Sequence, residues 1–296
     1  MKLLENISED LYKADQENLV LKYLQENKIM GNEDIKDEPN LFHCYWFGQF
    51  LPVHLLCIKS LLATQNVDKI YIWVPDLFKI APSVSLFKNL QKIEIKQFNK
   101  DIFDKITNVS QIKKDILYSR YNSLISTKLQ FFPNIEKQYA YASDLFRFII
   151  LNVYGGIYFD MDNVFLRNLN DIKIKRYLSQ WGSSLGGNAS ILKLEKDHNL
   201  IEIIMKKVPM YFYPQGTFEL DKPFDITIMH RSFFDPLWPE GINIEPFNML
   251  NDFFKKTNKI ILRNNFFNGA FTYHWHNRWD MPVEENSPYS QLLSQF

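Results

Sequence analysis

Residues 142–162 read ASDLFRFIILNVYGGIYFDMD, and this stretch decides the fold that we expect. Its first half is an apolar helix in which Asp144 and Arg147 are three residues apart, so that both side chains project from one side of the helix. Gly155 and Gly156 end the helix, because glycine takes a positive φ at little cost. The pattern predicts a helix that turns sharply into the next element.

A short strand, residues 157–159, leads from the glycines into two carboxylates, Asp160 and Asp162. On an extended chain, side chains two residues apart point the same way. Converging carboxylates repel each other unless a cation lies between them, and Mg²⁺ or Mn²⁺ is commonly shared between protein carboxylates and phosphate oxygens. An isolated Asp-x-Asp is usually a solvated turn, but the helix with its inward Asp/Arg pair favours a metal site here.

The pattern Ser-Asp-x-x-Arg followed by Tyr-Gly-Gly-Ile-Tyr-x-Asp-x-Asp resembles the DXD sugar-binding region of family 32 glycosyltransferases. It is also similar to the related catalytic domains of family 8 and of the large clostridial glucosylating toxins. The resemblance implies an α/β fold of the GT-A type, Rossmann-like, with a mixed central sheet and helical additions. It further implies a retaining transfer from a UDP-sugar, with Mn²⁺ or Mg²⁺ held by Asp160 and Asp162.

Composition sets limits on the other classes of function. The chain has 296 residues, 46% of them hydrophobic, which is enough for one large domain or two small ones. Lys and Arg together number 34, as do Asp and Glu, so no broad basic field exists and nucleic acid is not an expected partner. Cys44 and Cys57 lie in apolar stretches and are expected to be reduced core residues.

The N-terminal sequence carries acidic residues where a signal peptide would be apolar, and no run of about 18 apolar residues is present. We therefore expect a cytoplasmic protein, with peripheral membrane contact and a secreted effector left open. Residues 1–40 are expected to form two short helices, Ser8 to Ala14 and Gln16 to Met30. They are either a packing appendage or a contact surface, and residues 41–296 are the expected catalytic domain.

Residues 41–47 and 69–74 are predicted to be strands, and residues 92–98, in which isoleucines alternate with charged residues, are predicted to be a third strand near a sheet edge. The first contains His43-Cys44-Tyr45-Trp46-Phe47-Gly48, which resembles the opening His-x-x-Trp-x-Gly strand of the family. The resemblance implies that Trp46, with Phe47 beside it, stacks on the uracil of the donor; a core tryptophan is the alternative. His43 is expected to be structural. Asp76, after the second strand, is expected near the ribose.

Two helices are expected in the same part of the chain. Pro52 opens the first, and His54 within it is taken as incidental. The second lies in residues 101–135, with apolar positions at Ile112, Ile116, Leu124, Ile125 and Leu129.

Beyond the DXD motif, Asn188-Ala189-Ser190 resembles a family segment that follows a strand and lines the sugar pocket, which implies a donor contact for Asn188. His198 is expected near the start of a following helix. Residues 209–250 depart from the family pattern, so the acceptor site has no support from the sequence. Arg231 among them is expected at the surface, with an acceptor or phosphate contact as the alternative.

The C-terminal run Tyr273-His274-Trp275-His276-Asn277-Arg278-Trp279 resembles the closing His-x-x-x-x-Trp element of the family. The resemblance implies that a histidine joins the metal, and the choice between His274 and His276 stays open. An imidazole beside carboxylates suits Mn²⁺, which accepts nitrogen as well as oxygen. The Trp279 indole N–H is expected to donate to a phosphate oxygen. An aromatic tail packed on the core is the alternative.

The expected catalytic residues are Asp160, Asp162, Asp144 and Arg147. Asp144 accepts hydrogen bonds from sugar hydroxyls, Arg147 holds Asp144 or reaches the sugar, and Tyr158 supports the site. The expected reaction transfers a hexose or N-acetylhexosamine to a glycan hydroxyl. A toxin-like transferase acting on a protein hydroxyl, and a non-catalytic nucleotide-sugar binder, are the alternatives. A metal-dependent phosphoesterase is disfavoured because it needs more ligands than the sequence offers.

Overall fold

In the computed structural model of the chain, the described residues are 39–126, 135–180, 187–201, 226–237, 246–247, 249–267 and 269–296. The two helices expected in residues 1–40 lie outside this set, so the division into an appendage and a catalytic domain stays a prediction. None of the helices within the described ranges has the length and apolar character needed to cross a membrane.

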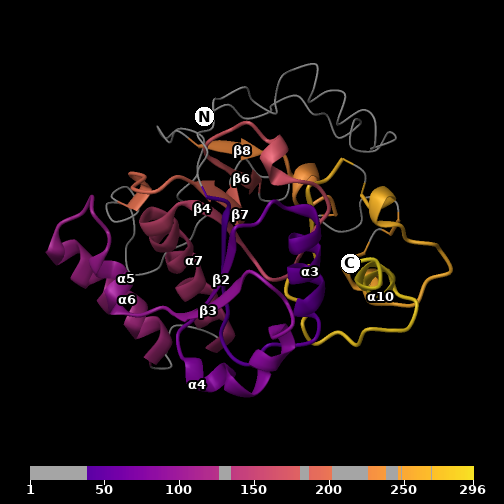
Figure 1. The fold of residues 1–296 in the computed structure, drawn as a ribbon, viewed down its shortest axis with the longest axis horizontal. Helices are drawn as coiled ribbons and strands as arrows, with labels where there is room; N and C mark the ends of the chain where they lie inside the picture. The colour runs from indigo at the N-terminus through magenta and orange to yellow at the C-terminus, as the bar shows by residue number, and fades with distance from the viewer. Residues whose placement is uncertain are drawn as a thin grey trace.

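The centre of the described fold is a seven-stranded sheet (Figure 1). In spatial order its strands are β3 Ile93–Gln97, β2 Lys69–Val74, β1 Leu41–Tyr45, β4 Gly156–Phe159, β7 Gly187–Leu194, β6 Tyr177–Gln180 and β8 Thr227–Met229. The first four run parallel, whereas β7 is antiparallel to both β4 and β6, and β8 is parallel to β6. This arrangement confirms the expected α/β fold with a mixed central sheet, and β3 lies at its edge as expected.

Helices cover both faces of the sheet (Figure 1). On one side lie α5 Lys100–Asp104, α6 Gln111–Ser126 and α7 Ile135–Tyr154, and on the other lie α3 His54–Thr64 and α10 Pro288–Leu293. The strands supply both cores by alternation: Ile157 and Phe159 pack on the α3 side, and Tyr158 on the α7 side. This alternation aims Tyr158 at the helix that carries Asp144 and Arg147.

Short elements complete the described chain. They are α4 Leu77–Ile80, η1 Ala81–Phe87, β5 Asn163–Phe165, η2 Leu169–Asp171, η3 Arg231–Phe233, η4 Leu250–Phe253, η5 Arg263–Asn265 and β9 Thr272–His274. β5 and β9 pair in a separate two-stranded sheet. Cys44 and Cys57 are free and buried, as expected.

The double glycine makes the turn from α7 into β4. Gly155 has φ +69° and donates its N–H to the Leu151 carbonyl at 2.8 Å, and Gly156 has φ +99°. A Cβ at Gly156 would lie 2.4 Å from the Leu41 carbonyl oxygen. Both the backbone angle and the close approach of β1 therefore require glycine at position 156.

Two expectations about helices are wrong in detail. α3 begins at His54 rather than at Pro52, because Pro52 lies in the preceding turn. In α6 the expected apolar positions Ile112 and Ile116 are 74% and 40% exposed, and the helix instead buries Leu117 and Tyr121. The Tyr121 hydroxyl lies 3.0 Å from that of Tyr45, so a polar aromatic anchors this helix. Leu129 lies outside the described residues.

Candidate active site

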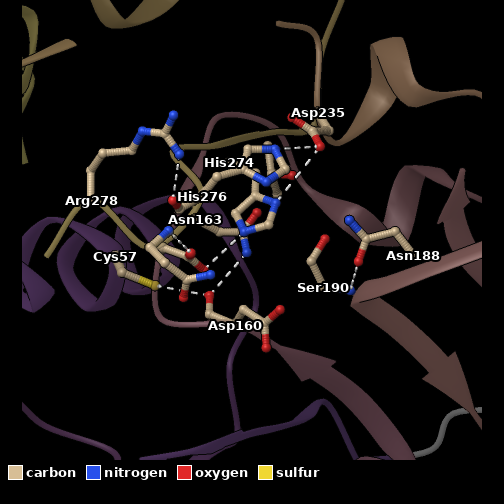
Figure 2. A network of polar contacts seen from close by, with 12 residues as sticks. Cys57, Asp160, Asn163, Asn188, Ser190, Asp235, His274, His276 and Arg278 are labelled. Atoms are coloured by element: carbon tan, nitrogen blue, oxygen red, sulfur yellow. Dashed lines mark hydrogen bonds and ion pairs between the residues drawn. The ribbon is translucent and has the colours of Figure 1, made fainter. Parts of the chain in front are cut away.

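The two aspartates of the DXD motif lie in the turn that joins β4 to β5, not on an extended strand. Strand alternation is therefore not what brings them together, and that part of the sequence argument is wrong. The turn is held by the Asp160 N–H, which donates to the Ser190 carbonyl at 2.9 Å, and by the Asn163 side-chain amide, which donates to the Asp160 carbonyl at 2.9 Å. In Figure 2, Asp160 of this turn lies below His274 and His276.

The pairing of β5 with β9 brings the C-terminal histidine cluster to the DXD turn. Asn163 is directly opposite His274 in this ladder, and the Trp275 N–H donates to the Asp162 carbonyl at 3.0 Å. His274 Nε2 consequently lies 3.0 Å from Asp162 Oδ1. One ligand atom from each of Asp160, Asp162 and His274 lies within 4.8 Å of the others.

A strained turn follows β9 and completes the contacts of Asp162. His276 and Asn277 have φ of +51° and +56°, a left-handed conformation that non-glycine residues seldom adopt. This conformation places the Asn277 N–H 2.7 Å from Asp162 Oδ2, where it donates a hydrogen bond. Backbone strain of this kind persists where the surrounding structure enforces it, often at functional sites.

Arg147 holds the acidic side chains in place from α7. Its guanidinium is buried, 2.9 Å from Asp144 and 3.5 Å from Asp160, and it donates to the Ala189 carbonyl at 2.7 Å. The sequence left open whether Arg147 holds Asp144 or reaches the sugar. With these contacts made, the guanidinium serves to hold the carboxylates.

Tyr158 is the second support of Asp160. Its hydroxyl donates to Asp160 Oδ1 at 2.5 Å and lies 2.9 Å from the Ser143 hydroxyl. The Arg147 guanidinium lies over its ring, 4.5 Å from the centroid. The hydrogen bond from Tyr158 to Asp160 agrees with the expected supporting role of Tyr158.

The electrostatics separate the two DXD carboxylates. Burial raises the pKa of Asp160, and the charge of Asp162 adds to that rise against the opposing effect of Arg147. Burial acts on Asp162 too, but the proximity and hydrogen bonding of His274 outweigh it and lower the pKa of Asp162. His274 has its pKa raised, since Asp162 and Asp235 overcome the effect of burial.

Asp144 is shifted as well. Burial raises the pKa of Asp144 to about 6, despite the neighbouring charge of Arg147. Anionic side chains held together in a buried site favour a bound cation.

The donor set fits a divalent metal ion. Asp162 Oδ1 is buried, and its close partner is His274 Nε2 at 3.0 Å, so an ion bound here would take a ligand atom from each of them. Two carboxylates and one imidazole suit Mn²⁺, and Mg²⁺ if the imidazole stays outside. His274, not His276, belongs to this group.

Comparison with protein families agrees with this geometry. Residues 52–179 match the family described as "Glycosyltransferase sugar-binding region containing DXD motif". The match spans α3, α7, β4 and the DXD turn, and it confirms the expected resemblance to glycosyltransferases and the expected class of enzyme, a transferase.

Solved structures give distant likenesses, and a search of curated proteins found no match. "PaToxG Glycosyltransferase" is 16% identical over 63% of this chain and 66% of its own, with a TM-score of 0.45. The UDP-bound glycosyltransferase domain from the YGT toxin is 11% identical, over 57% of this chain and 61% of its own, with a TM-score of 0.39. The galactosyltransferase LgtC in complex with donor and acceptor sugar analogs is 14% identical, over 86% of this chain and 96% of its own, with a TM-score of 0.40. This chain thus spans less than two thirds of the two toxin-derived chains.

Beside the sugar-binding region, the expected uracil-stacking residue lies in an aromatic group. Trp46 is half-buried, and its ring centroid is 4.2 Å from that of His54 and 4.9 Å from that of Trp279. Its indole N–H donates to the Gln49 carbonyl at 3.0 Å. His54, taken as incidental from the sequence, is therefore a buried neighbour of the expected donor site.

The other expected donor contacts are spread around the site. Phe47 stacks on Tyr139, and Asp76 caps α4 by accepting from the Phe78 N–H at 2.9 Å. The Trp279 indole donates to Asn277 Oδ1 at 3.1 Å, so this N–H must change partner to reach a phosphate. Their roles toward a donor stay predictions.

Asn188 lies inside β7, not after a strand as its expected counterpart does. Its Oδ1 accepts from the Ser190 N–H at 3.0 Å, and its buried Nδ2 has no hydrogen-bond partner among the described residues. The Ser190 hydroxyl is also buried without a hydrogen-bond partner among the described residues. Figure 2 shows both side chains beside the DXD turn. These two groups have unused capacity for a polar ligand.

Sequence reasoning missed Asp235 and misplaced Arg231. Asp235 is buried, with Oδ2 2.8 Å from His276 Nε2 and 3.7 Å from His274 Nδ1. Burial would raise the pKa of Asp235, but the two imidazoles lower it to about 2. Its only signal in the sequence is an aspartate set between Phe-Phe and Pro. Arg231 is 3% exposed, so the expectation of a surface arginine is wrong.

Two structural expectations hold. His43 is buried, accepts from the Trp73 indole at 3.2 Å and contacts the Gly155 carbonyl at 3.2 Å, as a structural histidine does. His198 accepts from the Leu200 N–H at 3.2 Å, which is a capping contact. The helix expected to follow lies mostly outside the described residues.

Proposed function

We propose that this chain is a retaining, metal-dependent hexosyltransferase that moves a hexose or N-acetylhexosamine from a UDP-sugar to a glycan hydroxyl. The observation that carries the proposal is the convergence of Asp160, Asp162 and His274 within 4.8 Å at the end of β4. These three residues come from two segments far apart in the sequence, and they present oxygen and nitrogen ligands on one point.

A divalent ion bound there would act as a Lewis acid toward the diphosphate of the donor. The chain's own residues shape the site around it. Arg147 and Tyr158 fix the Asp160 carboxylate, and the Asn277 N–H fixes that of Asp162. Because these hydrogen-bond donors are already in place, the site needs little reorganisation when the nucleotide sugar binds.

The sugar lies beside α7 in this proposal. Asp144 is 20% exposed at its side chain and is held by Arg147, so it has oxygen lone pairs to accept hydrogen bonds from sugar hydroxyls. The unpartnered Asn188 amide on β7 offers a donor on the other side. Selection among glucose, galactose and their N-acetyl forms would depend on contacts of this kind.

The nucleotide lies toward β1, where Trp46 offers an aromatic face for uracil. Departure of the diphosphate develops negative charge, which the Trp279 indole can meet once it leaves Asn277. Retention follows the family resemblance: attack occurs on the face that the phosphate leaves, and the leaving phosphate helps to deprotonate the acceptor hydroxyl.

The test is UDP release with Mn²⁺, screened across common UDP-sugars and followed by mass measurement of candidate acceptors. We expect release with one or two donors, loss of release with a chelator, and one added hexose on a glycan. A sugar found on a protein side chain instead would replace the glycan acceptor with a protein hydroxyl. UDP binding without release from any donor would make the chain a non-catalytic binder and overturn the proposal.

A further inference from the structure

Asp235 has a place in the site that neither the sequence motifs nor the family match covers, because it lies outside residues 52–179. Its carboxylate faces two imidazoles at once. Figure 2 shows His274 and His276 stacked between Asp235 and the DXD turn, and their ring centroids are 4.0 Å apart. A fully buried carboxylate requires such partners, since burying an unpaired charge is costly.

The backbone fixes Asp235 relative to the strand that carries His274. The Asp235 N–H donates to the Arg231 carbonyl at 2.7 Å, which closes the turn after η3. Two hydrogen bonds then tie the preceding residues to the start of β9: the Thr272 hydroxyl donates to the Phe234 carbonyl at 2.8 Å, and the Phe271 N–H donates to the Phe233 carbonyl at 2.6 Å. Asp235 and His274 therefore belong to one tightly connected unit.

The two nitrogens of His274 face different carboxylates. Nε2 lies 3.0 Å from Asp162 Oδ1, and Nδ1 lies 3.7 Å from Asp235 Oδ2. An imidazole that ligates a metal through one nitrogen must carry its proton on the other. With an ion on Nε2, the proton would be on Nδ1. Asp235 Oδ2 is the carboxylate oxygen that faces this nitrogen, although 3.7 Å is longer than a hydrogen bond.

We propose that Asp235 is a positioning residue that holds His274 with Nε2 directed at Asp160 and Asp162, while His276 anchors Asp235 from its other side. This inference rests on the proposed function, because it assumes an ion at the DXD turn. His276 Nε2 is 2.8 Å from Asp235 Oδ2, a hydrogen-bond distance that keeps the carboxylate directed at both rings. In this arrangement Asp235 and His276 do not touch the donor.

The same residues also offer a second place for an ion. Asp235, His274 and His276 also have ligand atoms within 4.8 Å of one another, so an ion could sit among them instead. The two arrangements differ in the number of imidazoles on the metal. An ion at the DXD turn has one imidazole ligand, from His274, whereas an ion among Asp235, His274 and His276 has two.

The experiment measures Mn²⁺ binding to the full chain by electron paramagnetic resonance, without donor or turnover. Electron spin echo envelope modulation with ¹⁵N-labelled histidine counts the coordinated imidazoles. For the wild type we expect one. In Asp235→Asn we expect Mn²⁺ affinity to fall by roughly 10–100-fold, the usual effect of an outer-shell change, with a weakened imidazole signal from the Mn²⁺ that still binds. Asp235→Glu should restore part of the affinity.

His276→Gln is the second variant, because its amide can still donate to Asp235. We expect it to keep the imidazole signal and to change Mn²⁺ affinity less than Asp235→Asn does. The matched control is Asp171→Asn, an exposed aspartate on η2, which should leave binding unchanged. Circular dichroism and urea unfolding of each variant separate loss of the fold from loss of positioning.

The outcomes distinguish the two proposals. Two imidazoles in the wild type, one of them lost in His276→Gln, would overturn the positioning role of Asp235. Wild-type Mn²⁺ affinity and an undiminished imidazole signal in folded Asp235→Asn would overturn it as well. If the wild type binds no Mn²⁺, or binds it without a coordinated imidazole, the metal site of the proposed function is wrong, and the role of Asp235 falls with it.

Discussion

Asn163 of β5 pairs with His274 of β9, and this one step of a short ladder places an imidazole 3.0 Å from Asp162. The pairing joins the DXD turn to a segment near the C-terminus. It explains why the His-x-x-x-x-Trp element belongs to the same site as the DXD motif, although most of the chain between β5 and β9 contributes nothing to the pairing. The candidate metal site depends on this contact.

Asp162→Asn should abolish metal-dependent UDP release and leave the fold intact. Asparagine keeps an oxygen to accept the Asn277 N–H but loses the charge that a cation requires. We expect a loss of more than about 100-fold, because even outer-shell changes often cost about 10–100-fold. UDP release by purified protein is the measurement, with Asp171→Asn as control. Near-normal turnover would remove Asp162 from the metal site.

Trp46→Ala should weaken UDP binding by about 1–3 kcal/mol, if the energies of base–aromatic stacking in nucleic-acid complexes apply. Calorimetric titration with UDP and Mn²⁺ measures it. Trp46→Phe keeps an aromatic face and should retain most of the affinity. An unchanged UDP affinity in a folded Trp46→Ala protein would assign this ring to the packing of His54 and Trp279 instead.

Gly156→Ala should be more destabilising than Gly48→Ala. Both glycines have positive φ, +99° and +91°, so alanine is strained at either position. A Cβ at Gly48 meets nothing within 4 Å, whereas at Gly156 it meets the Leu41 carbonyl at 2.4 Å. Overpacking typically adds about 1–3 kcal/mol, which is the difference that we expect between the two variants in urea unfolding. Equal losses would show that the approach of β1 to Gly156 is looser than described.

His43→Gln should reduce the loss of stability in mild acid. Burial lowers the pKa of His43 from 6.5 to about 3, so between these values the unfolded chain binds a proton that the folded chain does not. Stability therefore falls as the pH falls below 6.5, with a slope that approaches about 1.4 kcal/mol per pH unit for this one group. Glutamine can keep both hydrogen bonds of His43 but does not titrate.

Urea unfolding at pH 8, 6 and 5 measures this effect. We expect the wild-type and His43→Gln curves to converge as the pH falls. If the free energies of unfolding of the wild type and His43→Gln stay parallel from pH 8 to pH 5, His43 is protonated in the folded protein as well. The assignment of a neutral, buried His43 would then be wrong.

The sequence predicted the parts of this fold that depend on local pattern. Lys69–Val74 is a strand with the expected bounds, because a short apolar run between turns admits little else. The glycines at 155 and 156 mark the end of α7 because their conformation is forbidden to most residues. Asp144 and Arg147 form the expected ion pair at 2.9 Å, since helix geometry alone brings them together.

The remainder depends on contacts between distant segments, which one sequence does not display. Nothing near Asp235 indicates that it faces two histidines, and the pairing that directs His274 rather than His276 at Asp162 requires the register of β5 with β9. The buried face of α6 was misjudged for a related reason. Tyr121 is buried because Tyr45, on another element, offers its hydroxyl a partner.

The central claim is that one divalent ion binds at the DXD turn. Anomalous diffraction at the manganese edge, from crystals grown with Mn²⁺ and UDP, tests it most directly. We expect a single strong peak in contact with the carboxylate oxygens of Asp160 and Asp162 and with a diphosphate oxygen of UDP. A peak elsewhere in the molecule, or UDP bound with no manganese at that turn, would contradict the claim.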